Sequence, residues 1–115
     1  MKDFMLIFTN GSSSGQLSPE EMQDNMQQWF AWIEKLKASN TYISGEALLP
    51  EGKTVKGPKG VVTDGPFAES KELVGGYFIV RAASIEEAAE IAKDCPDLAL
   101  NGNVEIREVM KFDNM

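Results

Sequence analysis

The sequence predicts an α+β protein of ferredoxin-like architecture, in which an antiparallel sheet carries two helices on one face. Three observations predict this class. A strand-length apolar run lies near the N-terminus, two helix starts carry capping signals, and the last apolar segment alternates with charged residues. The expected order is strand, long helix, several strands, short helix and strand, which describes two β-α-β halves joined by a hairpin region.

The first expected elements are a buried strand and a long helix. The apolar run Phe4–Thr9 is too brief for a helix and is followed by turn-forming residues. Ser18 can cap a helix, Pro19 suits the first helical position, and Glu21 stands three residues after Ser18. These residues form a capping box, and we expect the helix to run to about Ala38.

One face of this helix is strongly apolar. Apolar residues recur at spacings of four and three, which predicts a stripe that faces the sheet. The stripe consists of Met22, Met26, Trp29, Ile33 and Leu36. Phe30 and Trp32 lie to either side of it, so the apolar face is broader than one small sheet requires. Either a second subunit buries part of this face, or the helix has a wide core-facing side.

The middle of the chain carries strand and turn signals. Thr41–Leu49 contains β-forming residues and a central Gly45, which suggests a strand that bends or bulges. Lys53–Lys56 and Val61–Thr63 read as short strands around a Gly-Pro-Lys-Gly turn, and therefore as a hairpin or β-ribbon. Leu73–Arg81 supplies a further strand with a Gly-Gly pair near its start.

A second helix and a final strand complete the pattern. Ser84, with Glu87 three residues later, predicts a second capping box, and the helix should stop at Pro96. One helical face carries Ala88, Ile91, Ala92 and Cys95. Val104–Arg107 alternates strictly, as a half-buried antiparallel strand does, and the pattern slips near Glu108 and Val109, which suggests a bulge.

With both helices on one face, the other face of the sheet needs a cover. The chain has 115 residues, the length of a single domain, so we treat residues 1–115 as one domain. A second copy of the same sheet is the simplest cover for a domain of this size. We therefore expect a homodimer with two-fold symmetry whose sheets pack face to face.

Composition excludes several classes of protein. The formal net charge is −7, and the 11 Lys and Arg residues are scattered along the chain, which argues against nucleic acid and anionic membranes as partners. No apolar stretch is long enough to cross a bilayer, and the N-terminal run is shorter than the hydrophobic region of a signal peptide. Cys95 is the only cysteine, so no intramolecular disulfide is possible, and we expect a cytoplasmic location.

A stretch in the second half of the chain resembles a known family. Residues 62–72 read Val-Thr-Asp-Gly-Pro-Phe-Ala-Glu-Ser-Lys-Glu and lead into Gly75-Gly76-Tyr77-Phe78, which resembles the DGPF-domain branch of the YCII-related proteins. Similar segments of that family fall at residues 4–7, 17–22, 45–48 and 92–96. The resemblance therefore covers nearly the whole chain.

The resemblance implies a dimeric ferredoxin-like α+β barrel, which agrees with the pattern above. It implies less about function, since many such proteins are uncharacterised and some occur with sigma factors. A His–Asp pair has been proposed as an active site in the wider family. This chain contains no histidine, so only the acid, Asp64, could correspond to that pair.

Asp64 is the strongest single site candidate. It begins the turn Asp64-Gly65-Pro66-Phe67, in which Pro66 lacks the amide that an aspartate at a turn start usually contacts. The carboxylate must therefore reach the Phe67 amide, another partner or solvent. Asp64 is then either a turn cap or a carboxylate in a cleft, acting as a general base or as an acceptor for a ligand.

Several polar residues are possible companions of Asp64, because the Asp64 turn and the neighbouring strands could bring them together. They are Glu46, Glu69, Lys71, Glu72 and Tyr77. We expect Asp64, Gly65, Pro66, Phe67, Glu46, Lys71 and Tyr77 to line a ligand-binding cleft. The alternative is that the charged residues of the loop are simply solvated. Arg81 and Arg107 could bind an anion, or pair with carboxylates on the same surface.

Other motifs carry less chemistry. The Gly11–Gly15 segment lies between a strand and a helix, but Gln16 stands where a phosphate-binding loop needs a lysine. Cys95 lies on an apolar helix face without a histidine to act as base, which indicates a core residue instead of a nucleophile. The composition excludes metal binding by histidine or by a cysteine cluster. We expect neither a metal nor a cofactor.

These observations lead to three hypotheses about function. The first is a cytoplasmic homodimer that binds a small polar molecule in a cleft near the Asp64 turn. The second is a small enzyme that uses Asp64 as a general base. The third, which follows from the resemblance, is a regulatory or scaffold module associated with a sigma factor.

Overall fold

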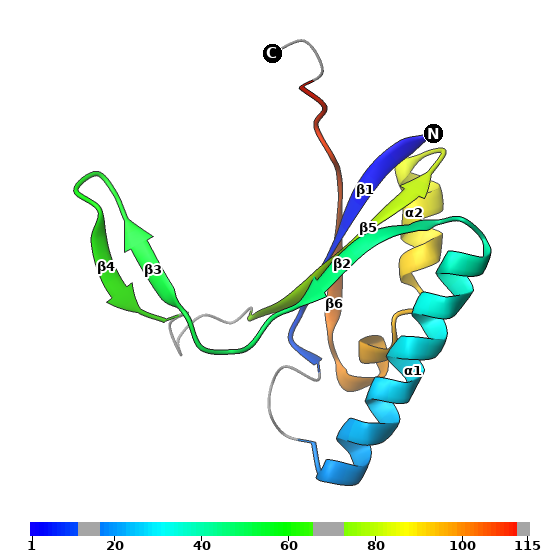
Figure 1. Cartoon of the computed structure of the whole chain (residues 1–115), viewed down its shortest axis with the longest axis horizontal. Coiled ribbons are helices and arrows are strands. Elements are labelled where there is room, and N and C mark those ends of the chain that lie inside the picture. The colour runs from blue at the N-terminus through cyan, green and yellow to red at the C-terminus, as the bar shows by residue number, and fades with distance from the viewer. Residues whose placement is uncertain (12–16, 66–72, 113–115) are drawn as a thin grey trace.

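Four strands form one antiparallel sheet in the spatial order β2-β5-β1-β6. They are β1 (Lys2–Thr9), β2 (Tyr42–Ala47), β5 (Val74–Ala82) and β6 (Asn103–Glu108). The computed structural model describes residues 1–11, 17–65 and 73–112. Figure 1 shows the helices α1 (Pro19–Ala38) and α2 (Ile85–Ala92) on the same side of this sheet. The predicted α+β class, with an antiparallel sheet and two helices, is confirmed.

The core lies between the sheet and the helices, and β1 contributes its centre. Phe4, Leu6 and Phe8 of β1 are buried, whereas Met5 and Ile7, which alternate with them, are only half-buried. This alternation is the period-2 pattern of a strand whose one face is covered. Both helices pack on the covered face with the buried residues Trp32, Leu36, Ala88 and Ala92.

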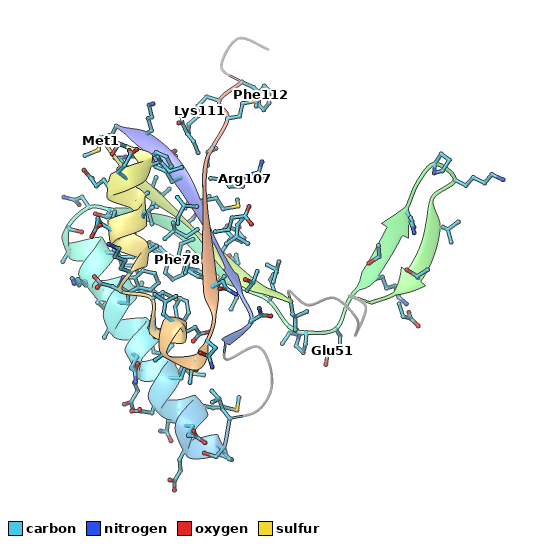
Figure 2. The ribbon with its side chains drawn as sticks, turned by 180° about the vertical axis from the view of Figure 1, so that it is seen from behind. Met1, Glu51, Phe78, Arg107, Lys111 and Phe112 are labelled. Carbon is cyan, nitrogen blue, oxygen red and sulfur yellow. The ribbon has the colours of Figure 1, made fainter. Side chains whose placement is uncertain are left out.

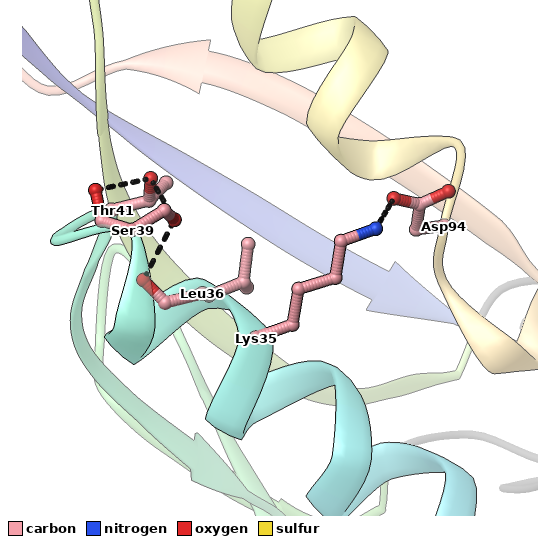
Figure 3. Close-up of polar contacts among 5 residues, drawn as sticks. All are labelled: Lys35, Leu36, Ser39, Thr41 and Asp94. Atoms are coloured by element: carbon pink, nitrogen blue, oxygen red, sulfur yellow. Dashed lines mark hydrogen bonds and ion pairs between the residues drawn. The ribbon is translucent and has the colours of Figure 1, made fainter.

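Helix α1 begins and ends with side-chain caps. At its start, Glu21 N donates to Ser18 Oγ at 3.2 Å and Ser18 N donates to a carboxylate oxygen of Glu21 at 3.1 Å, as the capping box predicts. The hydrogen bonds with the Ser18 backbone and side chain lower the pKa of the Glu21 carboxyl group. At the other end, Ser39 Oγ donates to Leu36 O, and Lys35 pairs with Asp94 beyond α2 (Figure 3).

Only part of the apolar stripe of α1 is buried in the core. Trp32 and Leu36 are buried, and Trp29 and Ile33 pack against the core from its edge. Met22 and Met26, however, are each 54% exposed. Trp32, which the sequence pattern places beside the stripe, is therefore itself a core residue. Figure 1 shows the reason: the N-terminal half of α1 extends away from the sheet, so its apolar residues have no strand beneath them.

The middle of the chain forms the predicted hairpin, which is separate from the main sheet. The strands β3 (Lys53–Lys56) and β4 (Val61–Asp64) pair only with each other. The irregularity expected at Gly45 of β2 lies earlier, since the pairing with β5 shifts between Tyr42 and Ser44. Gly45 itself stays in regular register with Phe78.

The region after β5 differs from the sequence prediction in two ways. Helix α2 ends at Ala92, before Cys95, because Cys95 precedes a proline and is extended (φ −61°, ψ 124°). A short 3₁₀ helix, η2 (Pro96–Leu100), follows, which the sequence pattern did not indicate. The second capping box is also incomplete: Ser84 Oγ accepts from Glu87 N at 3.2 Å, but the Glu87 carboxylate accepts from Ala83 N.

No helix among the described residues is long and apolar enough to span a membrane. Beyond β6, Val109 N donates to Asp3 O at 2.9 Å, so the chain remains bonded to β1 after the strand ends.

We expect Leu6→Ala to lower the free energy of unfolding by about 2–5 kcal/mol, because it leaves a cavity at a fully buried position. Leu49→Ala is the matched control, since Leu49 is 82% exposed and the same atoms are removed from solvent contact only. Urea denaturation measures both. Equal effects of the two substitutions would contradict the position of the core described here.

Candidate functional site

The structure places Asp64 at the end of the hairpin strand β4. Its side chain is 92% exposed, and Oδ1 accepts from Lys53 Nζ at 2.7 Å. Gly65 N donates to Gly52 O at 3.0 Å, which closes the base of the hairpin. An exposed ion pair of this kind contributes at most about 1 kcal/mol. Pro66, Phe67, Glu69, Lys71 and Glu72 lie outside the described residues, so the proposed bond from Asp64 to the Phe67 amide is not tested.

Glu46 and Tyr77 are brought together, but away from Asp64. They are direct partners across the β2–β5 pair, next to the pair Gly45–Phe78. Because side chains alternate along a strand, Glu46 and Tyr77 belong to the face opposite Phe78, which lies in the core. Arg81 and Arg107 also belong to this opposite face, since Arg107 pairs with Met5 and Arg81 with Asp3. No described contact joins any of these residues to Asp64.

A hollow lies elsewhere among the described residues, between α1 and the sheet. Its volume is about 470 Å³, within the range of small-molecule sites. Helix α1 contributes Met22, Met26, Trp29, Phe30 and Ile33 to its wall, and the sheet contributes Phe8, Tyr42 and Phe78. The hollow exists because the N-terminal half of α1 leaves the sheet while its apolar face still points toward it. We refer to it below as the α1 cavity.

Aromatic rings build the floor of the α1 cavity. Phe8 contacts Trp29 edge to face at 4.8 Å between ring centroids and Phe78 at 4.9 Å. Tyr42 contacts Phe78 edge to face at 5.2 Å, so the cluster reaches the edge strand β2. Edge-to-face pairs are the favoured arrangement of aromatic rings and hold each ring in place. The floor is therefore a fixed apolar surface. Phe78, labelled in Figure 2, lies between the sheet and the helices.

Gly45 is required by this aromatic floor. A Cβ atom at Gly45 would lie 2.5 Å from Phe78 Cδ1 and 2.9 Å from Tyr42 Oη. Both distances are too short for any side chain, because Phe78 is fixed in the core. Gly45 therefore gives the two rings room to meet at the β2 edge, which is a packing role and not the bend that the sequence suggested.

The polar end of the cavity is organised by Asp97 of η2. Its Oδ1 accepts from Asn25 Nδ2 at 2.9 Å and from Trp29 Nε1 at 3.0 Å. Asp97 is 6% exposed, and a buried carboxylate is stable only when it is hydrogen-bonded in this way. Gly11, with φ +67°, passes directly beside it, and a Cβ there would lie 2.8 Å from Asp97 Oδ2. Asp97 thus ties α1, η2 and the end of β1 together at the cavity wall.

The α1 cavity has a negative character. The Asp97 carboxylate lies in its wall, and no Lys or Arg lines it among the described residues. Glu46 lines its edge on β2, but the Glu46 side chain belongs to the opposite face of the sheet. Burial raises the pKa of the Tyr42 phenol, and the nearby Glu46 carboxylate adds to that shift. A bound anion would therefore meet the Asp97 carboxylate with no cation among these lining residues to compensate. The cavity suits a neutral or cationic molecule with a large apolar surface.

Sequence reasoning missed Asn25 and Asp97. One signal was available, since Asn25 and Trp29 are four residues apart on α1 and a polar residue interrupts an otherwise apolar stripe. Asp97 had no such signal, because its partners lie 72 and 68 residues away in the chain. The neighbouring indole, Trp32 Nε1, is buried without a hydrogen-bond partner among the described residues.

Cys95 is a core residue, as the sequence predicted. It is 5% exposed and packs with the cluster of buried hydrophobic residues. Burial raises the pKa of its thiol to about 11. Such a thiol is protonated at neutral pH and is a poor nucleophile. In the part of the chain that the structure describes, no three Cys, Asp or Glu side chains gather closely enough to hold a metal ion.

The described part of the glycine-rich segment does not indicate a phosphate site. Residues 12–16 lie outside the described residues, and Gly11 packs against a carboxylate. A carboxylate at this position opposes an anionic ligand.

Comparison with known proteins gives a family match but no activity. The model of the YCII-related domain matches residues 3–113, nearly the whole chain. An uncharacterized protein of Rhizobium meliloti (strain 1021) is 40% identical over 53 residues, which span 45% of this chain and 43% of that protein. The match thus covers less than half the length of this relative.

The Cys95 thiol should react slowly with iodoacetamide in the native protein. With a pKa of about 11, only about one thiol in a thousand is ionised at pH 8. Denaturant should expose the thiol and accelerate labelling by orders of magnitude, as mass spectrometry measures. Fast native labelling would contradict the burial of Cys95.

The same thiol should make stability depend on alkaline pH. Its folded pKa lies above the unfolded value of about 8.5, so the contribution to stability is complete below that value. It is lost as the pH rises through about 11. Cys95→Ala removes this component, and its urea midpoint should fall less steeply across this window than that of the unmodified protein.

Proposed function

The chain belongs to the YCII-related family, and on that premise we propose that it is a small-molecule-binding protein whose ligand occupies the α1 cavity. The observation that carries this proposal is a hollow of about 470 Å³ with an aromatic floor and a hydrogen-bonded polar end. A rigid apolar pocket with a few polar groups is the usual form of a small-molecule site. Three of its rings come from the sheet, so its shape is set before any ligand arrives.

The lining defines the class of ligand. A planar, mostly apolar molecule would stack against Phe8, Trp29 and Phe78, whose rings already contact one another. A hydrogen-bond donor or a positive charge on that molecule would match the carboxylate of Asp97 at the polar end. Such a ligand is less polar than the one expected from the sequence, because the Asp64 turn suggested a charged site and the cavity is mainly hydrocarbon.

The sequence around Asp64 bears on the family branch and on the second hypothesis. Residues 64–67 read Asp-Gly-Pro-Phe, and on that motif we assign the chain to the DGPF branch of the family. Beyond the residues that follow the turn, the Leu73 backbone exchanges hydrogen bonds with Asn10, a residue of the cavity wall. The exposed ion pair with Lys53 gives no support to Asp64 as a general base.

We further propose that the protein is a homodimer, a ferredoxin-like α+β barrel formed by two sheets. The supporting feature is the sheet face opposite the helices, which we call the open face. Its centre is apolar and consists of Met5, Ile7, Tyr77 and Ile79 on the adjacent strands β1 and β5. Charged residues flank it on β6, where Glu105 and Arg107 pair with Ile7 and Met5. An apolar centre with a polar rim is the composition of a protein interface.

Two earlier hypotheses remain predictions without a supporting contact. These are the association with a sigma factor and the cytoplasmic location.

Neutral and cationic aromatic probes should bind the α1 cavity, and anionic ones should not. Benzylamine, benzyl alcohol and phenylacetate share one ring and differ in charge, so they separate ring stacking from electrostatics. The first two should raise the melting temperature and quench Trp29 emission, with a stabilisation of about 2.7 kcal/mol at 100 times Kd. Phenylacetate should do neither.

Substitutions locate the binding site. Ala47→Phe adds a ring at the cavity edge and should abolish the thermal shift, whereas Leu49→Phe adds a ring at an 82% exposed position outside it and should not. Asp64→Asn should bind as the unmodified protein does. Loss of binding in Asp64→Asn with retention in Ala47→Phe would move the site to the Asp64 turn and contradict the proposal.

The open face should mediate dimerisation. Sedimentation should give twice the chain mass of 12.7 kDa for the unmodified protein. Ile79→Lys should give a monomer, because an unpaired buried charge costs about 3–5 kcal/mol, more than a hundredfold in affinity. The matched control is Ile85→Lys on α2, where the isoleucine is 46% exposed. A monomeric unmodified protein, or equal effects of both substitutions, would contradict the proposed dimer.

A further inference from the structure

The hairpin of β3 and β4 stands apart from the rest of the molecule. We call residues Lys53–Asp64 the arm, and the four-stranded sheet with its helices the body. Figures 1 and 2 show the arm extending from the body beyond Glu51, so solvent surrounds both of its faces. A two-stranded hairpin of four-residue strands is marginally stable by itself. The radius of gyration, 15.8 Å, exceeds the value of about 13 Å expected for a compact chain of this length, consistent with a projecting arm.

The arm carries more apolar surface than an isolated ribbon should expose. Val55, Val61 and Val62 are 68%, 57% and 58% exposed. Val55 and Val62 are cross-strand partners and share one face of the ribbon, whereas Val61 pairs with Lys56 on the other face. Valine favours strands that are at least half-buried. Both faces of the arm therefore present surface that a partner could cover.

The charges of the arm and the body are opposite. The arm holds Lys53, Lys56 and Lys59 against one carboxylate, Asp64, which gives it a net charge of +2. The whole chain has a net charge of −7, so the remainder carries −9. Lys56 and Lys59 have no ion pair among the described residues. The arm is thus electrostatically matched to an acidic surface.

A surface of that kind lies on α1, at the mouth of the α1 cavity. Met22, Met26 and Phe30 follow one another at intervals of four residues and are 54%, 54% and 59% exposed. Between Pro19 and Ile33, the helix has three carboxylates and neither Lys nor Arg. This line of apolar side chains on an acidic helix complements the valines and lysines of the arm in both polarity and charge.

The arm cannot reach this surface in its own chain. Figure 1 shows the helices on one side of the sheet and the arm on the other, extending past the open face. A second copy that covers the open face would lie in the space into which the arm extends. The arm of one protomer would then lie along the other protomer, and two-fold symmetry would provide the reciprocal contact.

We propose that the arm is an exchange element, which packs Val55 and Val62 on Met22, Met26 and Phe30 of the other protomer and closes the mouth of its α1 cavity. This inference rests on the proposed homodimer. Each ligand site is then completed by residues of two chains. The polar end of the cavity, at Asp97, comes from one chain, and the cover of its apolar mouth comes from the arm of the other.

A mixed disulfide cross-link tests this contact directly. Two chains are prepared in a Cys95→Ala background, one with Val62→Cys and the other with Met26→Cys. After mixing, subunit exchange and mild oxidation, a non-reducing gel should show a covalent dimer in the mixed sample, at twice the chain mass, well above its level in either sample alone. The matched control pairs Val62→Cys with Ile85→Cys on α2, a position 46% exposed against 54% for Met26, and should give little of this product.

The outcomes separate the arm from the dimer itself. A mixture that sediments as a dimer but gives no more product than the Ile85→Cys control overturns the exchange and leaves the open-face dimer standing. A monomeric unmodified protein instead contradicts the dimer on which the inference rests. Circular dichroism of each variant verifies that the fold is retained.

Charge reversal gives a second, independent measurement with intact cysteine. Lys56→Glu combined with Lys59→Glu should weaken dimerisation about tenfold or more at low ionic strength, and the difference should shrink as salt screens the contact. The same double variant should weaken benzylamine binding, because the cavity mouth opens. Unchanged dimer affinity at low salt and unchanged ligand binding would together overturn the proposal.

Discussion

The packing of Trp32 and Leu36 of α1 onto Phe8 and Phe78 of the sheet is the interaction on which the rest of the structure depends. It fixes only the C-terminal half of the helix, where the caps at Ser39 and the ion pair between Lys35 and Asp94 also lie. Nearer the N-terminal end of the helix, Asn25 and Trp29 donate hydrogen bonds to Asp97 of η2. A helix anchored at one end and spaced at the other leaves the α1 cavity between itself and the sheet.

This arrangement explains why a short chain has so much apolar surface outside its core. Methionines and a phenylalanine of α1, the centre of the open face and the valines of the arm all remain accessible in the single chain. Covering any of these surfaces would stabilise the protein, because burial of apolar surface contributes about 25 cal/mol per Å². In the proposed dimer, a ligand in the cavity, a second sheet on the open face and an exchanged arm would cover all three surfaces with one kind of chain.

The α1 cavity and Asp64 occupy different parts of the molecule. The Asp-Gly-Pro-Phe turn begins at the base of an exposed hairpin, and the polar groups of the cavity come from α1 and η2. Beyond the turn, the Leu73 backbone exchanges hydrogen bonds with Asn10 of the cavity wall.

The sequence by itself determined the α+β class, the strands of the sheet and the starts of the two α-helices, but not η2 or the end of α2. Capping residues such as Ser18 and Pro19 act on the adjacent amides, and the alternation in Phe4–Thr9 reflects one covered face, so both signals are local and can be read from a single segment. The cavity was decided only by the tertiary structure. Asp97 accepts hydrogen bonds from Asn25 and Trp29, which lie about seventy residues earlier in the chain. The exposure of Met22 depends on how far α1 diverges from the sheet. A periodic pattern predicts which face of a helix is apolar, but whether a strand, a ligand or a second chain covers that face depends on packing between distant segments.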